Sequence, residues 1–517
     1  MTLPRNTRIT QKKTGQCGPR AFSVYSVYSA AILVLLAGCT PEPPTLGPQP
    51  NSRAERQLVS DLDRIFGAPV MGQGIWGVEV KSLDTGRVLY ARNPRTLLMP
   101  ASNMKILTLS AAAETLGWDY RFKTVLETAA PIENGVLRGD LIVRGGGDPT
   151  INARGGRAAA VFGDWAAALQ SDGITSIDGA VIGDDNAFDD EWLGAGWAWD
   201  YLQYGYAAPI GALEYNEDNA RLTIRPGARI GDPVFLELAP GSGLRLLNRA
   251  TTIGSGGAST VDFVRHLNDN TLEVTGSLAL DAQPLDRDVA VANPTVYFAQ
   301  AVKDALAAHG ISVRGEALDA DDIFDAPPPG NRRVLAEADS PPLRDIATTM
   351  MKVSQNLYAE TLFKALATSN GGLGTAEGGR VVERAVLGSW GIPDTTFVQN
   401  DGSGLSRYDY VTADLIVTIL EHMFRDPKQH DAFLATLPVA GRDGTMASRL
   451  KHTRAEGNAL AKTGSISNVR TVSGYVKTRD GDTLAFSMLA NNFTIPAGNV
   501  TWMADVAIET LANYTRR

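Results

Sequence analysis

Three short motifs, spread over most of the chain, constrain its fold more than any other feature of the sequence. Ser102-Asn103-Met104-Lys105 lies near the start, Ser354-Gln355-Asn356 follows much later, and Lys462-Thr463-Gly464-Ser465 lies shortly before the end. Each motif is common by itself, but in this order the three describe a site with a serine nucleophile, lysine bases and no histidine. A fold that uses all three must bring together Lys105 and Ser354, which are 249 positions apart in the sequence.

The cysteines, histidines and charges exclude several other classes of protein. The only two cysteines, Cys17 and Cys39, lie in the N-terminal segment, so the remaining chain has no disulfide, no thiol nucleophile and no Cys-based metal site. The five histidines make no HExxH pattern, which disfavours a zinc hydrolase. We predict no metal and no cofactor. The net charge is −9 and the folded region has no run of Lys and Arg, so a nucleic-acid partner is not expected.

Other catalytic motifs are missing or misplaced. No serine satisfies G-x-S-x-G and no P-loop is present. One GxGxxG match, from Gly72 to Gly77, leads into a predicted strand instead of following one, so we interpret it as a loop.

The N-terminus has the pattern of an export signal. A short apolar stretch, Ala30 to Leu36, follows several basic residues and ends in Leu36-Ala37-Gly38-Cys39. This ending resembles the bacterial lipoprotein cleavage box, in which the cysteine is lipidated and becomes the first residue of the mature chain. The resemblance implies a lipid anchor on Cys39, and Thr40 in place of Asp points to the outer membrane, facing the periplasm. A plain secretory signal with an incidental cysteine is the alternative.

The chain beyond this signal divides by composition and periodicity. Five prolines between positions 40 and 50 predict a stiff tether. A β-hairpin with a turn at Asp84-Thr85-Gly86 precedes a helix that carries Ser102 and Lys105 on one face. Short β-like stretches follow up to about residue 340, and helical periodicity then returns. We predict a signal peptide at 1–38, the lipidated cysteine and tether at 39–55, a first catalytic part at 56–119, β-rich inserted domains at 120–340 and a second catalytic part at 341–517.

The chemistry of the motifs follows from what a serine hydroxyl needs. Ser102 requires a base, and Lys105 can act as one only if burial or a neighbouring cation lowers its pKa. Lys462 would provide that second cation. Two backbone N–H groups, those of Ser102 and Ser465, are the expected oxyanion hole. Taken singly, each motif is better explained as a helix cap, a polar turn or the start of a strand.

With these motifs placed, the chain resembles the D-alanyl-D-alanine carboxypeptidase/endopeptidase family, the class C low-molecular-mass penicillin-binding proteins. The three segments Gly145 to Thr150, Asp401 to Arg407 and Leu437 to Gly444 also resemble that family. The resemblance implies an α/β fold: a split serine β-lactamase/transpeptidase-like catalytic domain with a large β-rich insertion between the first and second motifs. The middle residue of the second motif departs from the family, because Gln355 stands where Asp or Asn is more usual.

The resemblance also implies the roles of the residues. Ser102 attacks a D-alanyl carbonyl of a peptidoglycan stem peptide and forms an acyl-enzyme, with Lys105 as general base and Ser354 as proton relay. Asn356 donates to the substrate, Lys462 and Thr463 bind its carboxylate, and Gly464 lets its backbone approach the strand. β-Lactam antibiotics are expected to acylate Ser102.

Several assignments remain open at the level of sequence. Asp200, next to Trp197, is a candidate contact for the amino end of a diaminopimelate side chain. Asp401 and Arg407 either position the substrate or stabilise a glycine-rich turn. Two other functions compete with the carboxypeptidase. One is a catalytically silent lipoprotein that binds peptidoglycan, and the other is a β-lactamase, although those enzymes are shorter and lack the insertion.

Overall fold

The computed structural model describes residues 50–323, 329–369 and 371–516. The predicted signal peptide, Cys39 and most of the predicted tether therefore lie outside the described residues. Within the described ranges, no helix is both long enough and apolar enough to span a bilayer.

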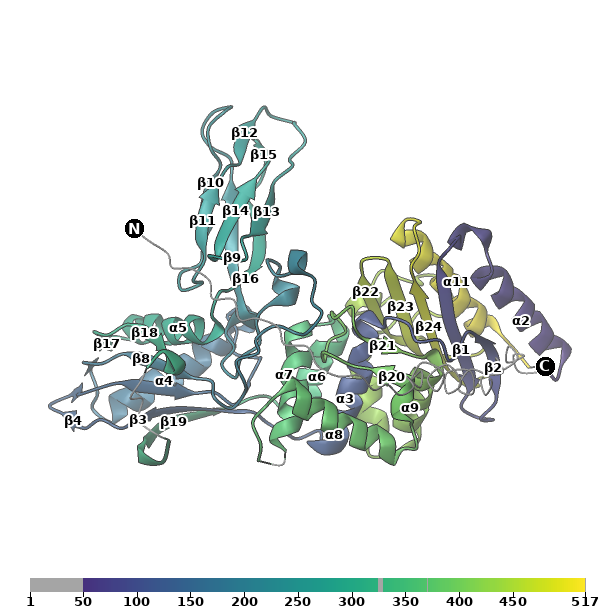
Figure 1. Cartoon of the computed structure of the whole chain (residues 1–517), viewed down its shortest axis with the longest axis horizontal. Coiled ribbons are helices and arrows are strands. Elements are labelled where there is room, and N and C mark those ends of the chain that lie inside the picture. The colour runs from purple at the N-terminus through teal and green to yellow at the C-terminus, as the bar shows by residue number, and fades with distance from the viewer. Residues whose placement is uncertain (1–49, 324–328, 370, 517) are drawn as a thin grey trace, which may run out of the picture. The chain divides into compact units, whose positions relative to one another are not determined.

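A five-stranded antiparallel sheet unites the two ends of the described chain, and its strand order is β2-β1-β24-β23-β22. The predicted hairpin is present, since β1 and β2 pair across a turn in which Gly86 has φ 70°. Strand β1 also pairs with β24 along its whole length, so strands from opposite ends of the sequence lie side by side (Figure 1). The strands are β1 (Ile75–Ser82), β2 (Val88–Arg92), β22 (Leu460–Ile466), β23 (Val469–Lys477) and β24 (Thr483–Asn491).

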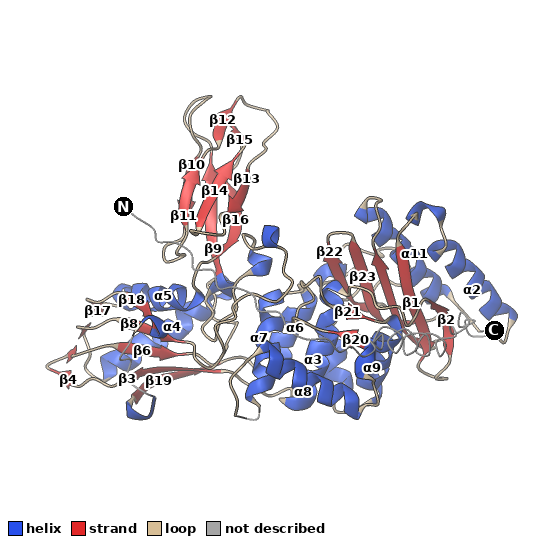
Figure 2. Ribbon diagram, viewed as in Figure 1, coloured by secondary structure: helices blue, strands red, loops and turns tan. Residues whose placement is uncertain are grey.

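Helices cover both faces of this sheet (Figure 2). On one face, α2 (Arg53–Phe66) and α11 (Ala497–Asn513) pack against alternate residues of β24, such as Phe486 and Met488. On the other face, Ala485 and Leu489 belong to a helical core. Because side chains alternate along a strand, β24 is buried on both sides and its sequence is almost continuously apolar.

The helical core has α3 (Met104–Thr115) near its centre, where every residue from Met104 to Ala113 is buried. Around it lie α6 (Leu343–Lys352), α7 (Asn356–Thr368), α8 (Ala376–Ser389), α9 (Ala413–Arg425) and α10 (His430–Thr436). The sequence predicted helical periodicity after about residue 340, but the structure breaks it between α6 and α7. Ser354 lies in that break with φ 64°, a left-handed conformation that a continuing α-helix does not allow.

The insertion leaves and re-enters the catalytic part at one place. Strands β3 (Lys123–Thr128) and β19 (Arg333–Asp339) pair antiparallel, with Lys123 opposite Asp339. Just before this ladder, the Ser340 N–H donates to the Phe122 carbonyl (2.8 Å), and the Ser340 hydroxyl accepts the Phe122 N–H (2.9 Å). Since its two ends are neighbours, a segment of more than 200 residues can be inserted without separating the elements that flank it.

The insertion contains two kinds of structure. The first is a sheet in the order β18-β8-β6-β3-β19, packed with α4 (Arg157–Ser171) and α5 (Pro294–Ala308) around its own core. The other strands here are β6 (Leu141–Arg144), β8 (Val181–Asp184) and β18 (Ala317–Asp319), and the four-stranded sheet beside it has β4 (Ile132–Glu133), β5 (Val136–Leu137), β7 (Ser176–Ile177) and β17 (Ser312–Val313).

The second is an all-β region with a separate small core. Its strands are β9 (Asn219–Arg225), β10 (Phe235–Leu238), β11 (Arg245–Asn248), β12 (Thr251–Ile253), β13 (Asp262–Arg265), β14 (Thr271–Thr275), β15 (Ser277–Ala279) and β16 (Leu285–Ala290). Helix α5, with its N-terminal Pro294, follows it directly in the chain.

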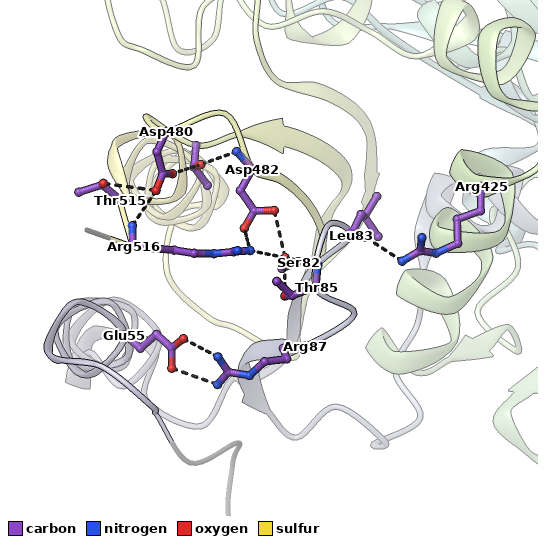
Figure 3. A network of polar contacts seen from close by, with 11 residues as sticks. Glu55, Ser82, Leu83, Thr85, Arg87, Arg425, Asp480, Asp482, Thr515 and Arg516 are labelled. Carbon is purple, nitrogen blue, oxygen red and sulfur yellow. Dashed lines mark hydrogen bonds and ion pairs between the residues drawn. The ribbon is translucent and has the colours of Figure 1, made fainter.

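A polar network ties the N-terminal helix and the C-terminal residues to the sheet (Figure 3). Arg87 in the β1–β2 hairpin donates to both carboxylate oxygens of Glu55 on α2 (2.6 and 3.0 Å). Arg516 donates to Ser82 Oγ (2.6 Å) and pairs with Asp482, which also accepts from Ser82. Helix α2 begins at Arg53, three residues before the start that the sequence predicted for the folded part.

Candidate active site

The first motif forms a tight turn that runs directly into α3. Ala101–Asn103 is a 3-10 turn, and Ala101 adopts a left-handed conformation with φ 45°. Lys105 follows one helical turn after Ser102, and its Nζ donates to Ser102 Oγ at 3.1 Å. The predicted spacing of nucleophile and base on one face is therefore present in the structure.

Lys105 is completely buried, and its ammonium group is held by oxygen atoms from other parts of the chain. Nζ donates to Asn356 Oδ1 (2.6 Å) and to the Ser403 carbonyl (2.8 Å). Burial lowers the pKa of Lys105 to about 7, against the opposing charges of Glu360 and Asp401. A lysine with this pKa is partly neutral near pH 7, as a general base must be.

The second and third motifs meet at Lys462. This residue lies in β22, is fully buried, and its Nζ donates to Ser354 Oγ (2.8 Å) and to the Thr463 carbonyl (2.7 Å). Burial, together with the charge of Lys105, lowers the pKa of Lys462 well below its usual range. The structure thus connects Ser102 to Lys105, Lys105 to Asn356, and Ser354 to Lys462.

A cavity of about 610 Å³ opens over these residues. Of the predicted site, Ser102, Ser354, Asn356, Thr463, Gly464 and Ser465 line it, whereas the two lysines lie beneath the surface. The other lining residues are Tyr201, Tyr206, Gly404, Leu405, Thr445, Arg449, Ile466, Ser467 and Thr501. The cavity therefore combines polar groups with a few apolar and aromatic walls, as small-molecule and peptide sites commonly do.

Strand β22 is the last strand of the sheet, so one of its edges is unpaired at the cavity. The Ala461 N–H points away from β23, because it donates to the Pro438 carbonyl (2.9 Å). Since N–H directions alternate along a strand, the N–H groups of Thr463 and Ser465 point to the same outer edge. This direction is the one that the predicted oxyanion hole requires of Ser465.

The packing of β22 also requires glycine at position 464, in addition to any need for a ligand to approach the strand. A Cβ at this position would lie 2.2 Å from Thr471 Oγ1 and 2.9 Å from both the Pro100 carbonyl and the Ser102 nitrogen. The strand can pack against the nucleophile turn only because residue 464 has no side chain.

Asp200 and Arg407, whose roles the sequence left open, lie beside the cavity. Asp200 is exposed, in a short 3-10 turn next to Tyr201, and does not line the cavity. Arg407 also lies outside the lining, but it donates to the carbonyl of Ser467, which does line it (3.3 and 3.4 Å). Both residues are near the rim and neither contacts Ser102, Lys105 or Lys462 in the described structure.

Asp401 organises the turn that holds Lys105. Its carboxylate is buried and accepts from the Gly404 N–H (2.7 Å), the Ser406 N–H (2.6 Å) and Trp197 Nε1 (2.8 Å). Of the two roles left open by the sequence, the contacts correspond to stabilisation of the glycine-rich turn, which places the Ser403 carbonyl against Lys105.

The sequence analysis missed three features of this site. Glu360 is a fully buried acid on α7 that accepts from the Gly402 and Ser403 N–H groups (both 2.8 Å), and burial beside Asp401 raises its pKa. Tyr206, from the insertion, accepts from Asn356 Nδ2 through its carbonyl (2.7 Å). Arg449 lines the cavity and forms an ion pair with Asp505 on α11 (2.7 Å). The Tyr206 contact uses a backbone carbonyl and so leaves no side-chain pattern in the sequence. The tyrosines of the stretch from 201 to 206 are the only signal that the sequence offers at this place.

Two groups of potential metal ligands occur elsewhere in the described residues, one formed by Glu114, His422 and Asp426 and the other by Asp185, Asp319 and Asp321. Neither contributes to the lining of the cavity at Ser102.

The chain is similar to known proteins in both sequence and fold. The model of the D-Ala-D-Ala carboxypeptidase 3 (S13) family matches residues 58–510. The D-alanyl-D-alanine carboxypeptidase of Actinomadura sp. (strain R39) is 35% identical over 455 residues, 85% of this chain and 82% of that protein. The D-alanyl-D-alanine carboxypeptidase DacB of Haemophilus influenzae is 29% identical over 81% of this chain and 85% of its own length.

A solved structure shares the fold. The crystal structure of penicillin binding protein 4 (dacB) from Haemophilus influenzae superposes with a TM-score of 0.76 at 27% identity, covering 88% of this chain and 99% of that one. A second structure of that protein, complexed with a β-lactam, has a TM-score of 0.71 at 25% identity over the same share of each chain. The predicted resemblance and the predicted split α/β fold with an insertion are confirmed. The chain belongs to the D-Ala-D-Ala carboxypeptidase 3 (S13) family of serine peptidases.

Proposed function

We propose that the protein is a penicillin-sensitive serine D-Ala-D-Ala carboxypeptidase and DD-endopeptidase that acts on the stem peptides of peptidoglycan through an acyl-enzyme. The observation that carries the proposal is the contact of Lys105 Nζ with Ser102 Oγ (3.1 Å) at a cavity beside the unpaired edge of β22. Family membership supplies the substrate class.

Acylation follows from the contacts of the three motifs. Neutral Lys105 takes the proton of Ser102 as its Oγ attacks the D-alanyl carbonyl carbon. The Ser102 and Ser465 N–H groups donate to the oxyanion of the tetrahedral intermediate. Ser354, which accepts from Lys462 (2.8 Å), relays the proton that Lys105 took from Ser102 to the departing amine, so Lys105 is neutral again when the amine leaves. D-Alanine leaves a carboxypeptidase substrate, whereas the cross-linked stem peptide leaves an endopeptidase substrate.

Deacylation repeats the same steps with water. Lys105 accepts a proton from the water that attacks the acyl carbonyl, and the Ser102 oxygen recovers a proton as the ester bond breaks. A β-lactam enters the first half of this sequence, but its leaving nitrogen stays attached to the acyl group after the ring opens. The tethered nitrogen then obstructs hydrolysis, so we expect the penicilloyl-enzyme to be long-lived.

Substrate recognition combines the strand edge with polar groups of the cavity. An extended peptide can pair with the outward N–H groups of β22. Thr463, Thr445 and Arg449 line the cavity and are candidates for binding a terminal carboxylate, although the two threonine hydroxyls now bond each other and Arg449 is paired with Asp505. At the rim, Asp200 is a candidate contact for the amino end of the diaminopimelate side chain, and Arg407 is a candidate for positioning the substrate. An endopeptidase substrate carries a second peptide in place of terminal D-alanine, and the open side of the cavity has to accept it.

The N-terminal segment directs the enzyme to its substrate in this proposal. A signal peptide at 1–38 is removed, Cys39 is lipidated, and the protein is anchored in the outer membrane with its catalytic part in the periplasm. The proposal is supported by the basic residues, the apolar stretch and the Leu36 to Cys39 box of the sequence. Peptidoglycan lies in the same compartment, within reach of a tethered enzyme.

Mass spectrometry of the purified protein after brief exposure to benzylpenicillin tests the catalytic proposal. We expect one penicilloyl adduct on the Ser102 peptide, complete loss of the adduct in Ser102→Ala, and an unchanged adduct in Ser110→Ala, which removes a buried hydroxyl from α3, the helix that follows Ser102.

Two other outcomes would replace the proposal. An unmodified protein that leaves penicillin intact would favour the silent peptidoglycan-binding lipoprotein. An unmodified protein with hydrolysed penicillin would indicate a β-lactamase.

A further inference from the structure

A strained turn of the insertion lies against the second motif. Asn216, Glu217 and Asp218 have φ values of 53°, 58° and 51°, three consecutive non-glycine residues in the left-handed region. Such backbone is unfavourable for L-amino acids and persists only where surrounding contacts hold it.

The insertion holds the backbone of this turn on several sides. The Asn216 N–H donates to the Ile151 carbonyl (3.1 Å), and the Ala153 N–H donates to Asn216 Oδ1 (2.7 Å). The Val291 N–H donates to the Asp218 carbonyl (3.1 Å). With its backbone secured in this way, the turn presents the Glu217 side chain in a defined position.

Glu217 reaches out of the insertion to Gln355, the middle residue of the second motif. Gln355 Nε2 donates to Glu217 Oε2 (2.5 Å), and Gln355 Oε1 accepts the Leu357 N–H (3.1 Å) at the start of α7. Both ends of the amide are therefore used. One end caps α7, and the other is tied to the strained turn.

The residues on either side of Gln355 are those that the reaction uses. Ser354 has a left-handed backbone and a hydroxyl bonded to Lys462, and Asn356 bonds to Lys105. Because left-handed backbone is strained, this three-residue segment needs external support to stay in place. Glu217 does not line the cavity at Ser102, and its contact with the second motif is the hydrogen bond from Gln355.

We propose that Glu217 is a positioning residue: by holding Gln355 it keeps the Ser354 hydroxyl and the Asn356 amide where the acylation step needs them. The inference rests on the proposed function, and it gives the insertion a role in catalysis. It also explains the departure at the middle of the second motif. Gln is longer than the Asp or Asn that is more usual there, so its amide can reach Glu217 and donate a hydrogen bond to it.

Exchanging the two partners tests the proposal. Gln355→Glu places a second carboxylate against Glu217, and we expect the rate constant of acylation by a fluorescent penicillin to fall by about tenfold or more, because misplaced groups slow a reaction strongly. Glu217→Gln keeps an acceptor and should change the rate constant by about twofold at most. The double variant E217Q/Q355E restores one donor and one acceptor, so its rate constant should return to within about threefold of the wild type.

A matched control separates positioning from general loosening of the insertion. Lys364 on α7 forms an ion pair with Asp189 of the insertion (2.5 Å), two helical turns beyond the second motif. Asp189→Asn should lower the melting temperature without changing the acylation rate constant. Thermal unfolding of every variant shows that the compared proteins are folded.

Each remaining outcome decides the question. Normal acylation of Gln355→Glu, failure of the double variant to recover, or an equal loss in Asp189→Asn would overturn the positioning role while the proposed function stands. A wild-type protein that takes up no penicillin would overturn both.

Discussion

At the scale of single residues, the site depends on two buried lysines, and burial makes it unfavourable for both to be protonated at once. Lys105 and Lys462 are each fully buried, and the burial of both lowers their pKa values. Desolvation disfavours the ammonium form, and two cations near one another disfavour it further. In the proposed reaction this arrangement replaces the histidine of other serine peptidases, because it provides a neutral amine close to physiological pH.

This arrangement predicts how acylation depends on pH. The base form of Lys105 is neutral, and burial lowers its pKa to about 7, so the fraction able to accept a proton rises as pH increases through 7. We expect the acylation rate constant to increase from pH 5.5 and to level off above about pH 8. Stopped-flow measurements with a fluorescent penicillin, at pH values where the protein remains folded, would check this.

A substitution of the base provides the control for the pH profile. Lys105→Arg keeps a cation, but a guanidinium stays protonated at these pH values, so acylation should be slower by about two orders of magnitude or more. A rate constant in the wild type that is flat or falls between pH 5.5 and 8 would contradict Lys105 as the base.

At the scale of elements, the catalytic motifs lie where regular structure ends or is exposed. Ser102 occupies the 3-10 turn before α3, Ser354 the break between α6 and α7, and Thr463 an edge strand. At such positions, backbone N–H groups and side chains are not all used within the element and can face a ligand. The rigid elements behind them, above all the buried α3, keep the groups in place.

Helix α8 contains a buried acid that makes stability depend on pH. Burial raises the pKa of Glu383 from 4.5 to about 8, and its contact is Gln399 Nε2 (3.2 Å). The folded state thus keeps a proton that the unfolded state loses, so the free energy of unfolding falls as pH rises from about 4.5 to 8.

Replacing this acid by its amide tests the pH dependence. Because Glu383→Gln cannot ionise, we expect its gain in melting temperature over the wild type to be larger at pH 8 than at pH 5. Glu377→Gln, on the same helix, should show no such gain, since Glu377 is exposed and paired with Arg380, which lowers its pKa. Differential scanning calorimetry at the two pH values would decide, and an equal gain at both would contradict the assignment.

At the scale of the whole molecule, two segments of the chain, one before the insertion and one after it, together build the catalytic part. Strand β1 pairs with β24, and β3 pairs with β19 at the junction of the insertion. The insertion in turn contributes Tyr206 and Glu217 contacts to the second motif. The β-rich segment is therefore in direct contact with the residues proposed to catalyse the reaction.

The proposed anchoring can be tested on the full chain in a Gram-negative host. Cys39→Ala removes the thiol that would be lipidated, so we expect the protein to leave the membrane fraction and to retain penicillin binding in the soluble fraction. Cys17→Ala is the matched control, because it removes the other cysteine from the part that the signal would discard. Fractionation and the intact mass of the mature protein measure both, and membrane association that persists in Cys39→Ala would contradict a lipid anchor.

Much of the fold and the site could be predicted from sequence because the relevant signals are local. The period-two pattern and the Asp84 to Gly86 turn predicted the β1–β2 hairpin, and the apolar period predicted α3 with Ser102 and Lys105 one turn apart. The three motifs and their order identified the family, which the comparisons confirm. Residue type and short spacing carry this information, since both the chemistry of a side chain and the face of a helix are set within a few positions.

Tertiary structure alone decided what depends on distant contacts. The break that gives Ser354 its left-handed backbone was not visible in the helical periodicity, and the packing of Gly464 against Ser102 joins positions far apart in the sequence. Burial, which lowers the pKa of Lys105, and the hydrogen bond from Gln355 to Glu217 also arise only when remote segments meet. Periodicity reports which face of an element is apolar. It does not report which partner covers that face, and desolvation and long-range hydrogen bonds are determined by the partner.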